Sequence, residues 1–357
     1  MTMRLDRRRF NLMLGAGALA GAGLGAPSAR AATTITVLNW QGYGTDEPWA
    51  LKAFQEKTGI EVKHDYFNAE SEMITKVQTN PGAYDVVLVN SGRVRQLTDG
   101  FIEAVDLAKF PNAKDLDPAL KMHPNFVVDG KPYGVAWLWG MTAIGARQGK
   151  VGKDVSFDEF LNPKWKDRFA MNDDPIVAIA LGCMMSGQDI NAPKDLKLAA
   201  EKLKSLKPNV KLLWQSEDEW NKAFAADQFD ISLYWSGAAV RSFRNSKLPV
   251  EFIVPKEGPI GWLDTQTIPT SSKNKEAAAA FINYMIDPGF YVEWATKVGA
   301  PASANAAAMN ALPADDLNKI VHDAKYLQKM QINGPLPDDV RQSFVDTWTE
   351  VKAFYAK

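Results

Sequence analysis

Short apolar runs that alternate with helix-forming segments constrain the fold of this chain more than any other feature. Residues 35–39, 60–66 and 85–89 have the length and composition of buried strands. Between them lie two helical patterns, one that runs from Pro48 to a stop signal at Gly59 and one over residues 70–79. This βαβα order predicts a mostly parallel sheet with helices on both faces.

A second unit of the same kind is predicted after Tyr133. It has strands at 143–146, 168–171 and 230–234 and helices at 175–185 and 196–206. We also expect a helix at 93–99, an extended segment at 258–269 and a helix at 275–286. The last segment carries an apolar stripe at helical spacing, which predicts an amphipathic helix packed on a core: Val340, Phe344, Trp348, Val351 and Tyr355.

The first 31 residues have the pattern of an export signal of the twin-arginine type. Arg7-Arg8-Arg9-Phe10 precedes a small apolar run at 12–26, and Ala29-Arg30-Ala31 offers a cleavage site. A membrane anchor is the alternative, but a spanning helix needs about 20 strongly apolar residues, and this run is shorter and diluted with Gly and Ala. We therefore predict cleavage after Ala31 and a periplasmic mature protein.

The charge of the chain and its single cysteine exclude several kinds of binding partner and covalent attachment. The 41 basic and 42 acidic residues become 36 and 41 without the five arginines and one aspartate of residues 1–31, which gives a net charge of −5. Such a surface argues against binding to nucleic acid or to an anionic membrane. A single cysteine, Cys183, allows neither an internal disulfide nor a lipid anchor near the cleavage site. The remaining 326 or so residues exceed a usual single core, so we expect two domains.

Motifs for metal binding and nucleophilic catalysis are missing from the sequence. The three histidines, His64, His123 and His322, are far apart, and no HExxH, CxxC or GxSxG motif occurs. We predict no metal and no cofactor.

Polar and aromatic residues instead gather where predicted strands end. In open α/β sheets, ligands bind at the carboxyl edge of the strands. Two further residues, Trp262 and Asp264, lie on the extended return segment. Carboxylates beside aromatic rings suit an organic cation, since rings attract cations by roughly 0.5 to 2 kcal/mol each. The predicted binding residues are Trp40, Tyr43, Asn90, Ser91, Asp174, Trp235, Trp262 and Asp264.

Several motifs resemble those of the periplasmic spermidine/putrescine-binding proteins, in order and over nearly the whole mature chain. The motifs are Val37-Leu38-Asn39-Trp40, Lys57-Thr58-Gly59-Ile60-Glu61-Val62, Tyr84-Asp85-Val86-Val87, Thr142-Ala143-Ile144-Gly145, Trp235-Ser236-Gly237, Pro255-Lys256-Glu257-Gly258 and Trp262-Leu263-Asp264. The resemblance implies a two-lobed α/β periplasmic binding protein of type II, monomeric and without enzyme activity, that delivers its solute to an inner-membrane ABC permease. It also implies that the residues predicted above form the cleft.

The resemblance further implies how the chain is divided between the lobes. The first lobe would comprise residues 32–137 and 265–308, and the second residues 138–264 and 309–357. Hinge crossovers are expected at 136–140 and 259–265.

Departures from the polyamine-binding pattern leave the solute open. Gly92-Arg93 stands where those proteins have a tyrosine, and Val177 stands where they have a second acidic residue. Losing a carboxylate and gaining an arginine suits a solute with one amine and one carboxylate, because each buried ammonium needs a partner. A small zwitterion or carboxylate, such as an amino acid or an opine-like compound, is therefore the alternative to a polyamine. An exported enzyme and a binding protein used for sensing are the alternative roles.

Overall fold

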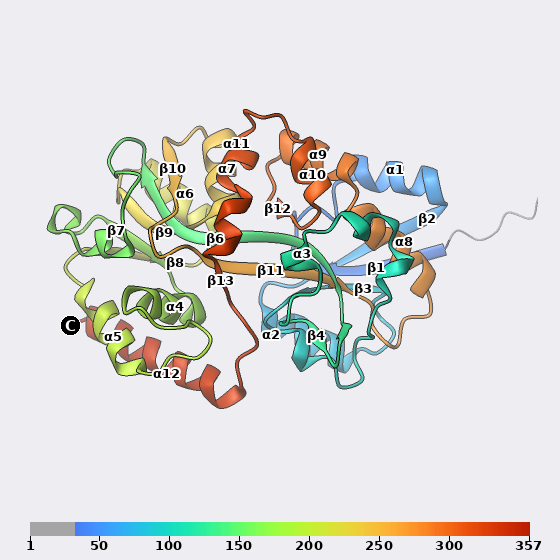
Figure 1. Cartoon of the computed structure of the whole chain (residues 1–357), viewed down its shortest axis with the longest axis horizontal. Helices are drawn as coiled ribbons and strands as arrows, with labels where there is room; N and C mark the ends of the chain where they lie inside the picture. Colours follow the sequence, from blue (N-terminus) through green and yellow to red (C-terminus); the bar gives the residue numbers. More distant parts are fainter. Residues whose placement is uncertain (1–32) are drawn as a thin grey trace, which may run out of the picture. The chain divides into compact units, whose positions relative to one another are not determined.

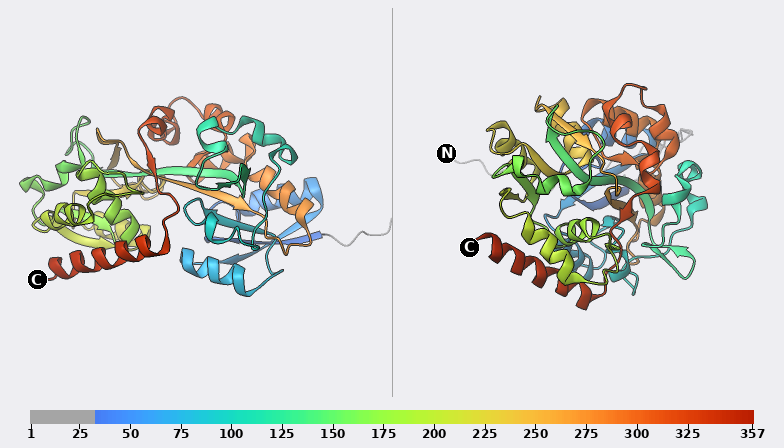
Figure 2. Two further views of the ribbon diagram at one scale, coloured as in Figure 1. Left: turned by 60° about the horizontal axis from the view of Figure 1, so that its bottom comes forward. Right: turned by 60° about the vertical axis from the view of Figure 1, so that its left-hand side comes forward.

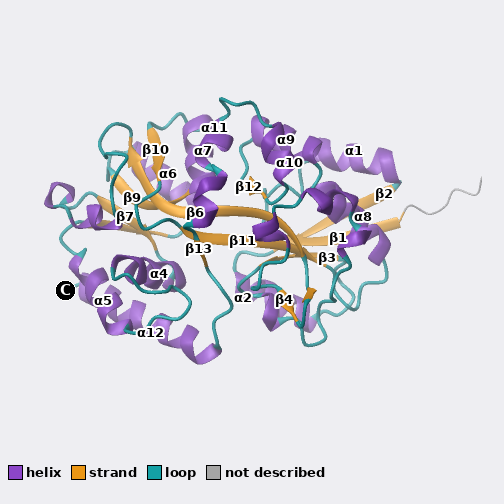
Figure 3. Ribbon diagram, in the orientation of Figure 1, coloured by secondary structure: helices purple, strands orange, loops and turns teal. Residues whose placement is uncertain are grey.

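The computed structural model describes residues 33–357, which form one compact unit; the predicted export signal lies outside the described residues. Figure 1 shows the order of the elements along the chain, and Figure 3 separates helices from strands. The strands are β1 (Thr33–Asn39), β2 (Ile60–Tyr66), β3 (Val86–Asn90), β4 (Val127–Val128), β5 (Lys131–Pro132), β6 (Val135–Arg147), β7 (Phe169–Asn172), β8 (Val210–Trp214), β9 (Ile231–Trp235), β10 (Val250–Ile253), β11 (Ile260–Thr267), β12 (Ala302–Ser303) and β13 (Gln331–Ile332).

Twelve α-helices accompany these strands in the described part of the chain. They are α1 (Pro48–Thr58), α2 (Glu70–Thr79), α3 (Pro118–Lys121), α4 (Pro175–Met185), α5 (Leu196–Ser205), α6 (Glu217–Ala225), α7 (Ser236–Arg244), α8 (Lys275–Met285), α9 (Pro288–Lys297), α10 (Ala306–Ala311), α11 (Leu317–Val321) and α12 (Asp338–Tyr355). None of the helices in residues 33–357 is both long enough and apolar enough to cross a membrane.

The main sheet is continuous and mixed, in the order β2-β1-β3-β11-β6-β9-β7-β8. β1 pairs in parallel with β2 and β3, and β7 pairs in parallel with β8 and β9. β11 runs antiparallel to β3 and β6, and β6 runs antiparallel to β9. β11 and β6 lie side by side through the middle of the ribbon (Figures 1 and 2). The predicted α/β class is confirmed: β11 and β6 lie in the middle of the sheet, between one group of parallel strands, β2-β1-β3, and another, β9-β7-β8.

The buried apolar side chains separate into cores that these two strands connect. One core, which we call the first lobe, uses residues 35–141 and 263–312. The second lobe holds two clusters, drawn from 144–260 and 344–351. The chain thus leaves one core and enters the other within β6, after Met141, and within β11, before Leu263. The residue boundaries that we predicted for the two lobes stay a prediction.

β6 is much longer than the predicted strand at 143–146. All of its residues except the last are buried. Of its two glycines, Gly140 lies before the predicted strand and makes the sequence resemble a break, whereas Gly145 lies within the predicted strand. Both glycines are required by packing, because a Cβ at Gly140 would lie 2.2 Å from the Trp262 ring and one at Gly145 would lie 2.7 Å from Cβ of Tyr234. The glycines therefore mark close packing within a continuous strand.

The helix predicted at 93–99 is wrong. Only Val94–Gln96 form a single 3-10 turn. Val94 and Leu97 are both fully buried, and the amide N–H of Leu97 bonds to the carbonyl of Val94 three residues back. The chain then turns, because Phe101 and Ile102 both donate to the Leu97 carbonyl. Arg93 and Gln96 also donate to carbonyls three residues back, which is the 3-10 hydrogen-bond pattern and not the α-helical one.

The predicted C-terminal helix is confirmed as α12, which packs on α4 and α5 of the second lobe. Phe344, Trp348 and Val351 from its predicted stripe are buried in that core. The indole N–H of Trp348 donates to Asp173 at 2.7 Å, so this carboxylate, which follows β7, is committed to holding the helix. Its neighbour Asp174 does not contact α12 in this way and is instead the N-cap of α4.

Candidate functional site

A buried asparagine shapes the loop that follows β1. The side-chain amide of Asn39 donates to Thr45 Oγ1 at 2.7 Å and to the Tyr43 carbonyl at 3.3 Å. Gly44 has a φ of 83°, and a Cβ there would lie 2.6 Å from the Trp294 ring, so only glycine lets the loop rest on that indole. The loop is thereby fixed in a conformation that directs the Tyr43 hydroxyl toward β11.

Asp264 on β11 is the centre of the site. The Tyr43 hydroxyl donates to its Oδ2 at 2.9 Å, and the Asn90 amide donates to its Oδ1 at 2.9 Å. The side chain is 7% exposed. Burial raises the pKa of this carboxyl to about 6, and the two hydrogen bonds limit the rise. Because each carboxylate oxygen has two lone pairs, Asp264 keeps capacity to accept further donors.

Strand register places three more predicted residues near this carboxylate. Asp264 lies opposite Asn90 on β3, and Trp262 lies opposite Gly140 on β6. Trp235 on β9 lies opposite Thr142, two residues further along β6. Residues opposite each other, or two apart on one strand, share a face of the sheet. Asn90, Asp264, Trp262 and Trp235 therefore line one face across the junction of the two lobes.

Asp174 contributes a carboxylate from the second lobe. It is the N-cap of α4, and its Oδ1 accepts the Val177 amide N–H at 2.9 Å. Burial raises its pKa, while that hydrogen bond and the charge of Arg93 lower it. Arg93 follows β3 in the first lobe, so its effect on Asp174 shows that charges of the two lobes interact.

Glu70 is a member of this site that the sequence analysis missed. It is the first residue of α2, and burial followed by the charge of Asp264 raises its pKa to about 8. Arg93 lowers the pKa and Asp174 raises it. Because charge interactions inside a protein weaken with distance, Glu70, Arg93, Asp174 and Asp264 form one electrostatic group. An acidic residue in a first helical turn is so common that no sequence pattern distinguishes Glu70 from other such residues.

Trp40 and Ser91 lie at the predicted strand ends, with different surroundings. The half-buried Trp40 ring packs on Phe67, with 4.4 Å between the ring centroids. Ser91 is fully buried, and its hydroxyl accepts from the Asn125 amide at 3.2 Å. That amide also donates to the Asn333 carbonyl at 2.9 Å. The contacts show how Ser91 joins neighbouring segments; a role for either residue in binding stays a prediction.

The chemistry of the group favours a positively charged solute. Three carboxylates from two lobes face one guanidinium, and indole rings flank them on the sheet. Within residues 33–357, no cluster of His, Cys, Asp or Glu has the arrangement of a metal site. A hollow of about 650 Å³ beside Arg244 and Asp316 contains none of the four charged groups. We therefore define the candidate site by its charged side chains and by the register of β3, β11, β6 and β9, and we do not place it in this hollow.

Comparisons with known proteins identify the family of this chain. Residues 49–320 match the family model described as bacterial extracellular solute-binding protein. The chain is 30% identical to the spermidine/putrescine-binding periplasmic protein of Salmonella typhimurium, over 89% of this chain and 91% of that protein. It is also 30% identical to the protein of the same name in Escherichia coli, over 81% and 82% of the two chains.

Solved structures share the fold. The spermidine/putrescine ABC transporter substrate-binding protein of Streptococcus pneumoniae superimposes with a TM-score of 0.80 and 21% identity, covering 90% of this chain and 99% of that one. A Treponema pallidum lipoprotein gives a TM-score of 0.77 and 21% identity, covering 89% and 99%. The family model matches most of this chain, and the Salmonella typhimurium relative aligns with 89% of it. The chain therefore belongs to the family of bacterial extracellular solute-binding proteins.

Proposed function

We propose that this protein captures a polyamine or a related small amine in the periplasm and delivers it to an inner-membrane ABC permease. The observation that carries the proposal is the buried Asp264, which keeps free lone pairs and whose charge interacts with a second acid, Glu70. A buried ammonium needs such partners, and a buried carboxylate needs a cation. The names of the relatives at 30% identity support the same ligand class.

The proposed mechanism is closure of the two lobes around the solute. β6 and β11 carry the chain between the cores, and the residues that we assign to the solute come from both lobes. Solute that docks on Asp264 in the first lobe would be covered by Asp174 and Trp235 from the second. The permease would then recognise the closed form. Small-angle scattering should show a smaller radius of gyration when the solute is added, and an unchanged radius with bound solute would refute closure.

This function requires no chemical step. The charged group lacks the paired nucleophile and base that covalent catalysis needs. The one serine–histidine hydrogen bond near the lobe junction, between Ser236 and His322, is fully buried. We therefore propose a binding protein and not an enzyme.

A thermal-shift screen tests the ligand class. Putrescine, spermidine, 4-aminobutanoate and glutarate should be compared at equal concentrations. A ligand at about 100 times its dissociation constant stabilises a protein by roughly 2.7 kcal/mol, so the correct class raises the melting temperature by several degrees. The proposal predicts the largest shifts with putrescine or spermidine. Shifts with glutarate alone would contradict it.

A zwitterionic solute is the second candidate, and Arg93 favours it. Within residues 33–357, Arg93 makes no ion pair at 4.0 Å or less, although its charge reaches both Glu70 and Asp174. A guanidinium in this position could bind a solute carboxylate. Putrescine and 4-aminobutanoate differ mainly in one end group, so Arg93→Gln separates the candidates. It should weaken 4-aminobutanoate binding if Arg93 holds a carboxylate, and it should strengthen putrescine binding if Arg93 only repels a cation.

A further inference from the structure

Glu70 carries a buried acceptor that the fold does not use. Its Oε2 atom is shielded from solvent and has no hydrogen-bond partner in the described part of the chain. Buried polar atoms are nearly always paired, so an exception asks for an explanation. Glu70 begins α2 and does not cap it: the N-cap is Ala69, which offers no side-chain hydrogen bond. This oxygen therefore makes no hydrogen bond that would stabilise the described part of the fold.

The surroundings of Glu70 point to a ligand. Asp264 on β11 and Asp174 on α4 both raise its pKa, so the lobes bring three acids together. Arg93 is the cation that opposes them, and it forms no ion pair with any carboxylate of residues 33–357. Each carboxylate oxygen of Asp264 accepts one hydrogen bond and has a lone pair left. The group thus has excess negative charge and spare acceptors, which is the complement of an ammonium ion.

We infer, on the basis of the proposed amine-binding function, that Glu70 binds the solute directly: with Asp264 it holds the ammonium end, and the pair selects amines with N–H donors over quaternary ammonium compounds. A primary ammonium has three N–H donors, which can be shared between Glu70 Oε2 and the free lone pairs of Asp264. A quaternary ammonium has no N–H and would leave both acceptors unpaired, even though aromatic rings attract it.

The inference includes a balanced proton transfer. Burial and the charge of Asp264 raise the pKa of Glu70 to about 8, so at pH 7 this carboxyl holds a proton when no cation is near. Arrival of the ammonium favours the ionised form, and the proton leaves to the buffer as the ion pair forms. The pKa of Asp264 is raised only to about 6, so at pH 7 it contributes little to this release. Binding at pH 7 should therefore release close to one proton, mainly from Glu70.

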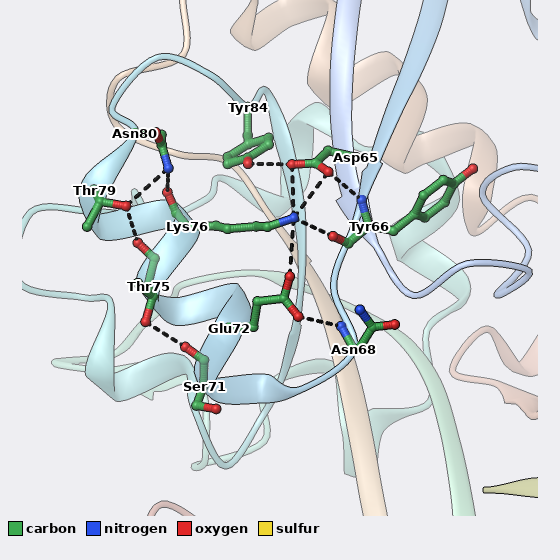
Figure 4. Close-up of polar contacts among 10 residues, drawn as sticks. All are labelled: Asp65, Tyr66, Asn68, Ser71, Glu72, Thr75, Lys76, Thr79, Asn80 and Tyr84. Carbon is green, nitrogen blue, oxygen red and sulfur yellow. Dashed lines mark hydrogen bonds and ion pairs between the residues drawn. The ribbon is translucent and has the colours of Figure 1, made fainter.

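Glu72 provides a matched control on the same helix. Its Oε2 accepts the Asn68 amide N–H at 2.9 Å, and its Oε1 lies 3.4 Å from the Lys76 ammonium. Figure 4 shows this carboxylate within a network that also holds Asp65 and Tyr84. Both of its oxygens thus have partners on α2 or in the loop before it. Glu72→Gln removes one negative charge from α2 at a carboxylate that has partners of its own.

Titration calorimetry at pH 7 in buffers of different ionisation enthalpy measures affinity and proton release together. For putrescine we expect wild type to release close to one proton. Glu70→Gln should bind about 10 to 100 times more weakly, as loss of a hydrogen bond to a charged group implies, and should release almost none. Glu72→Gln should match wild type in both. Butylamine should bind wild type more tightly than tetramethylammonium, and Glu70→Gln should narrow that difference.

The outcomes separate this inference from the proposed function. If wild type binds putrescine and Glu70→Gln keeps both its affinity and its proton release, the role of Glu70 is refuted and the amine-binding function stands. If wild type binds 4-aminobutanoate but no polyamine, and Glu70→Gln weakens that binding, the polyamine proposal fails and the role of Glu70 stands. If wild type binds no compound with an amine, both fail.

Discussion

The Tyr43 hydroxyl donates a hydrogen bond of 2.9 Å to Asp264 Oδ2, across 221 positions of sequence. Tyr43 lies in the loop after β1, and Asp264 lies on a strand that passes from one lobe to the other. Asp264 is buried and Tyr43 is half-buried. Desolvation followed by the charge of Asp264 raises the pKa of Tyr43 well above its usual value. Tyr43 is thus a donor at any physiological pH, and it holds the carboxylate in one orientation.

Removing the charge of Asp264 should weaken binding more than it weakens the fold. Asp264→Asn keeps the size of the side chain and an acceptor for one of its two donors. A charged hydrogen bond contributes about 1.5 to 3 kcal/mol, so affinity for putrescine should fall about 10- to 100-fold by calorimetry. Asp338→Asn, on the exposed first turn of α12, is the control and should bind like wild type. Equal affinities for the two variants would remove Asp264 from the site.

Binding should weaken as the medium becomes acidic. The solute amine stays charged below pH 8, but Asp264 gains a proton as the pH falls through about 6. Protonation of Asp264 should lower the affinity about tenfold between pH 7 and pH 5, in addition to the roughly 100-fold loss that protonation of Glu70 implies over the same interval. Calorimetry on Asp264→Asn should show only the loss that is due to Glu70.

Stability without added solute should have the opposite pH dependence. The pKa of Asp264 is raised in the folded state from 3.8, so the folded protein binds more protons than the unfolded chain between these values. Its contribution to stability is then lost as the pH rises from about 4 to 6. Chemical denaturation at pH 4.5 and 6.5, with wild type and Asp264→Asn, measures this contribution. A wild type that gains as much as the variant over this interval would contradict the raised pKa.

The Trp262 ring should be sensitive to a single methyl group on β6. In Gly140→Ala, the new Cβ would lie 2.2 Å from the ring and must displace it. Such overpacking typically costs about 1 to 3 kcal/mol, so both the melting temperature and solute affinity should fall. Gly152→Ala is the control, since the nearest atom to its Cβ is 3.8 Å away in Val155. Wild-type affinity in Gly140→Ala would show that the position of Trp262 does not matter for binding.

A buried hydrogen-bond chain at the lobe junction should contribute to stability. Ser236 Oγ accepts the Met141 amide N–H at 3.0 Å and lies 2.8 Å from His322 Nε2. Since His322 Nδ1 lies 2.9 Å from the Asn318 carbonyl, Nδ1 carries the proton and Nε2 accepts from Ser236. Burial lowers the pKa of His322 to about 4, which keeps the ring neutral.

Ser236→Ala would therefore leave two buried polar groups without partners. The free energy of unfolding should fall by about 1 to 3 kcal/mol, measured by denaturant titration. Ser246→Ala removes an exposed hydroxyl beyond the end of α7 and should change it by less than about 0.5 kcal/mol. If the two variants are equally stable, the hydrogen bonds of Ser236 do not contribute to the free energy of unfolding.

Local patterns in the sequence predicted most of the elements. The α2 and α4 helices match their predicted bounds. α4 begins with a capping Asp174 followed by Pro175 and is apolar throughout, and α2 buries Met73 and Val77 on one face. The helix predicted at 93–99 failed because Val94 and Leu97, three positions apart, are compatible with both an α-helix and the 3-10 turn that forms. β6 was predicted too short because the Trp262 ring that packs over Gly140 comes from a distant strand.

The same distinction applies to the site. The link between Asp264 and Asn90 was within reach of sequence reasoning, since strand ends in α/β sheets converge. Glu70 was not, because the acids that share its surroundings, Asp264 and Asp174, lie far away in the sequence. The hydrogen bond from Asn125 to Ser91 has the same origin, and no local pattern around Ser91 indicates it.

A crystal structure of the protein with putrescine tests the central claim most directly. The account predicts that one ammonium nitrogen lies within about 3 Å of an Asp264 carboxylate oxygen, with Glu70 beside it and Trp235 and Trp262 against the methylene chain. Putrescine bound with both nitrogens away from Asp264 would contradict the account.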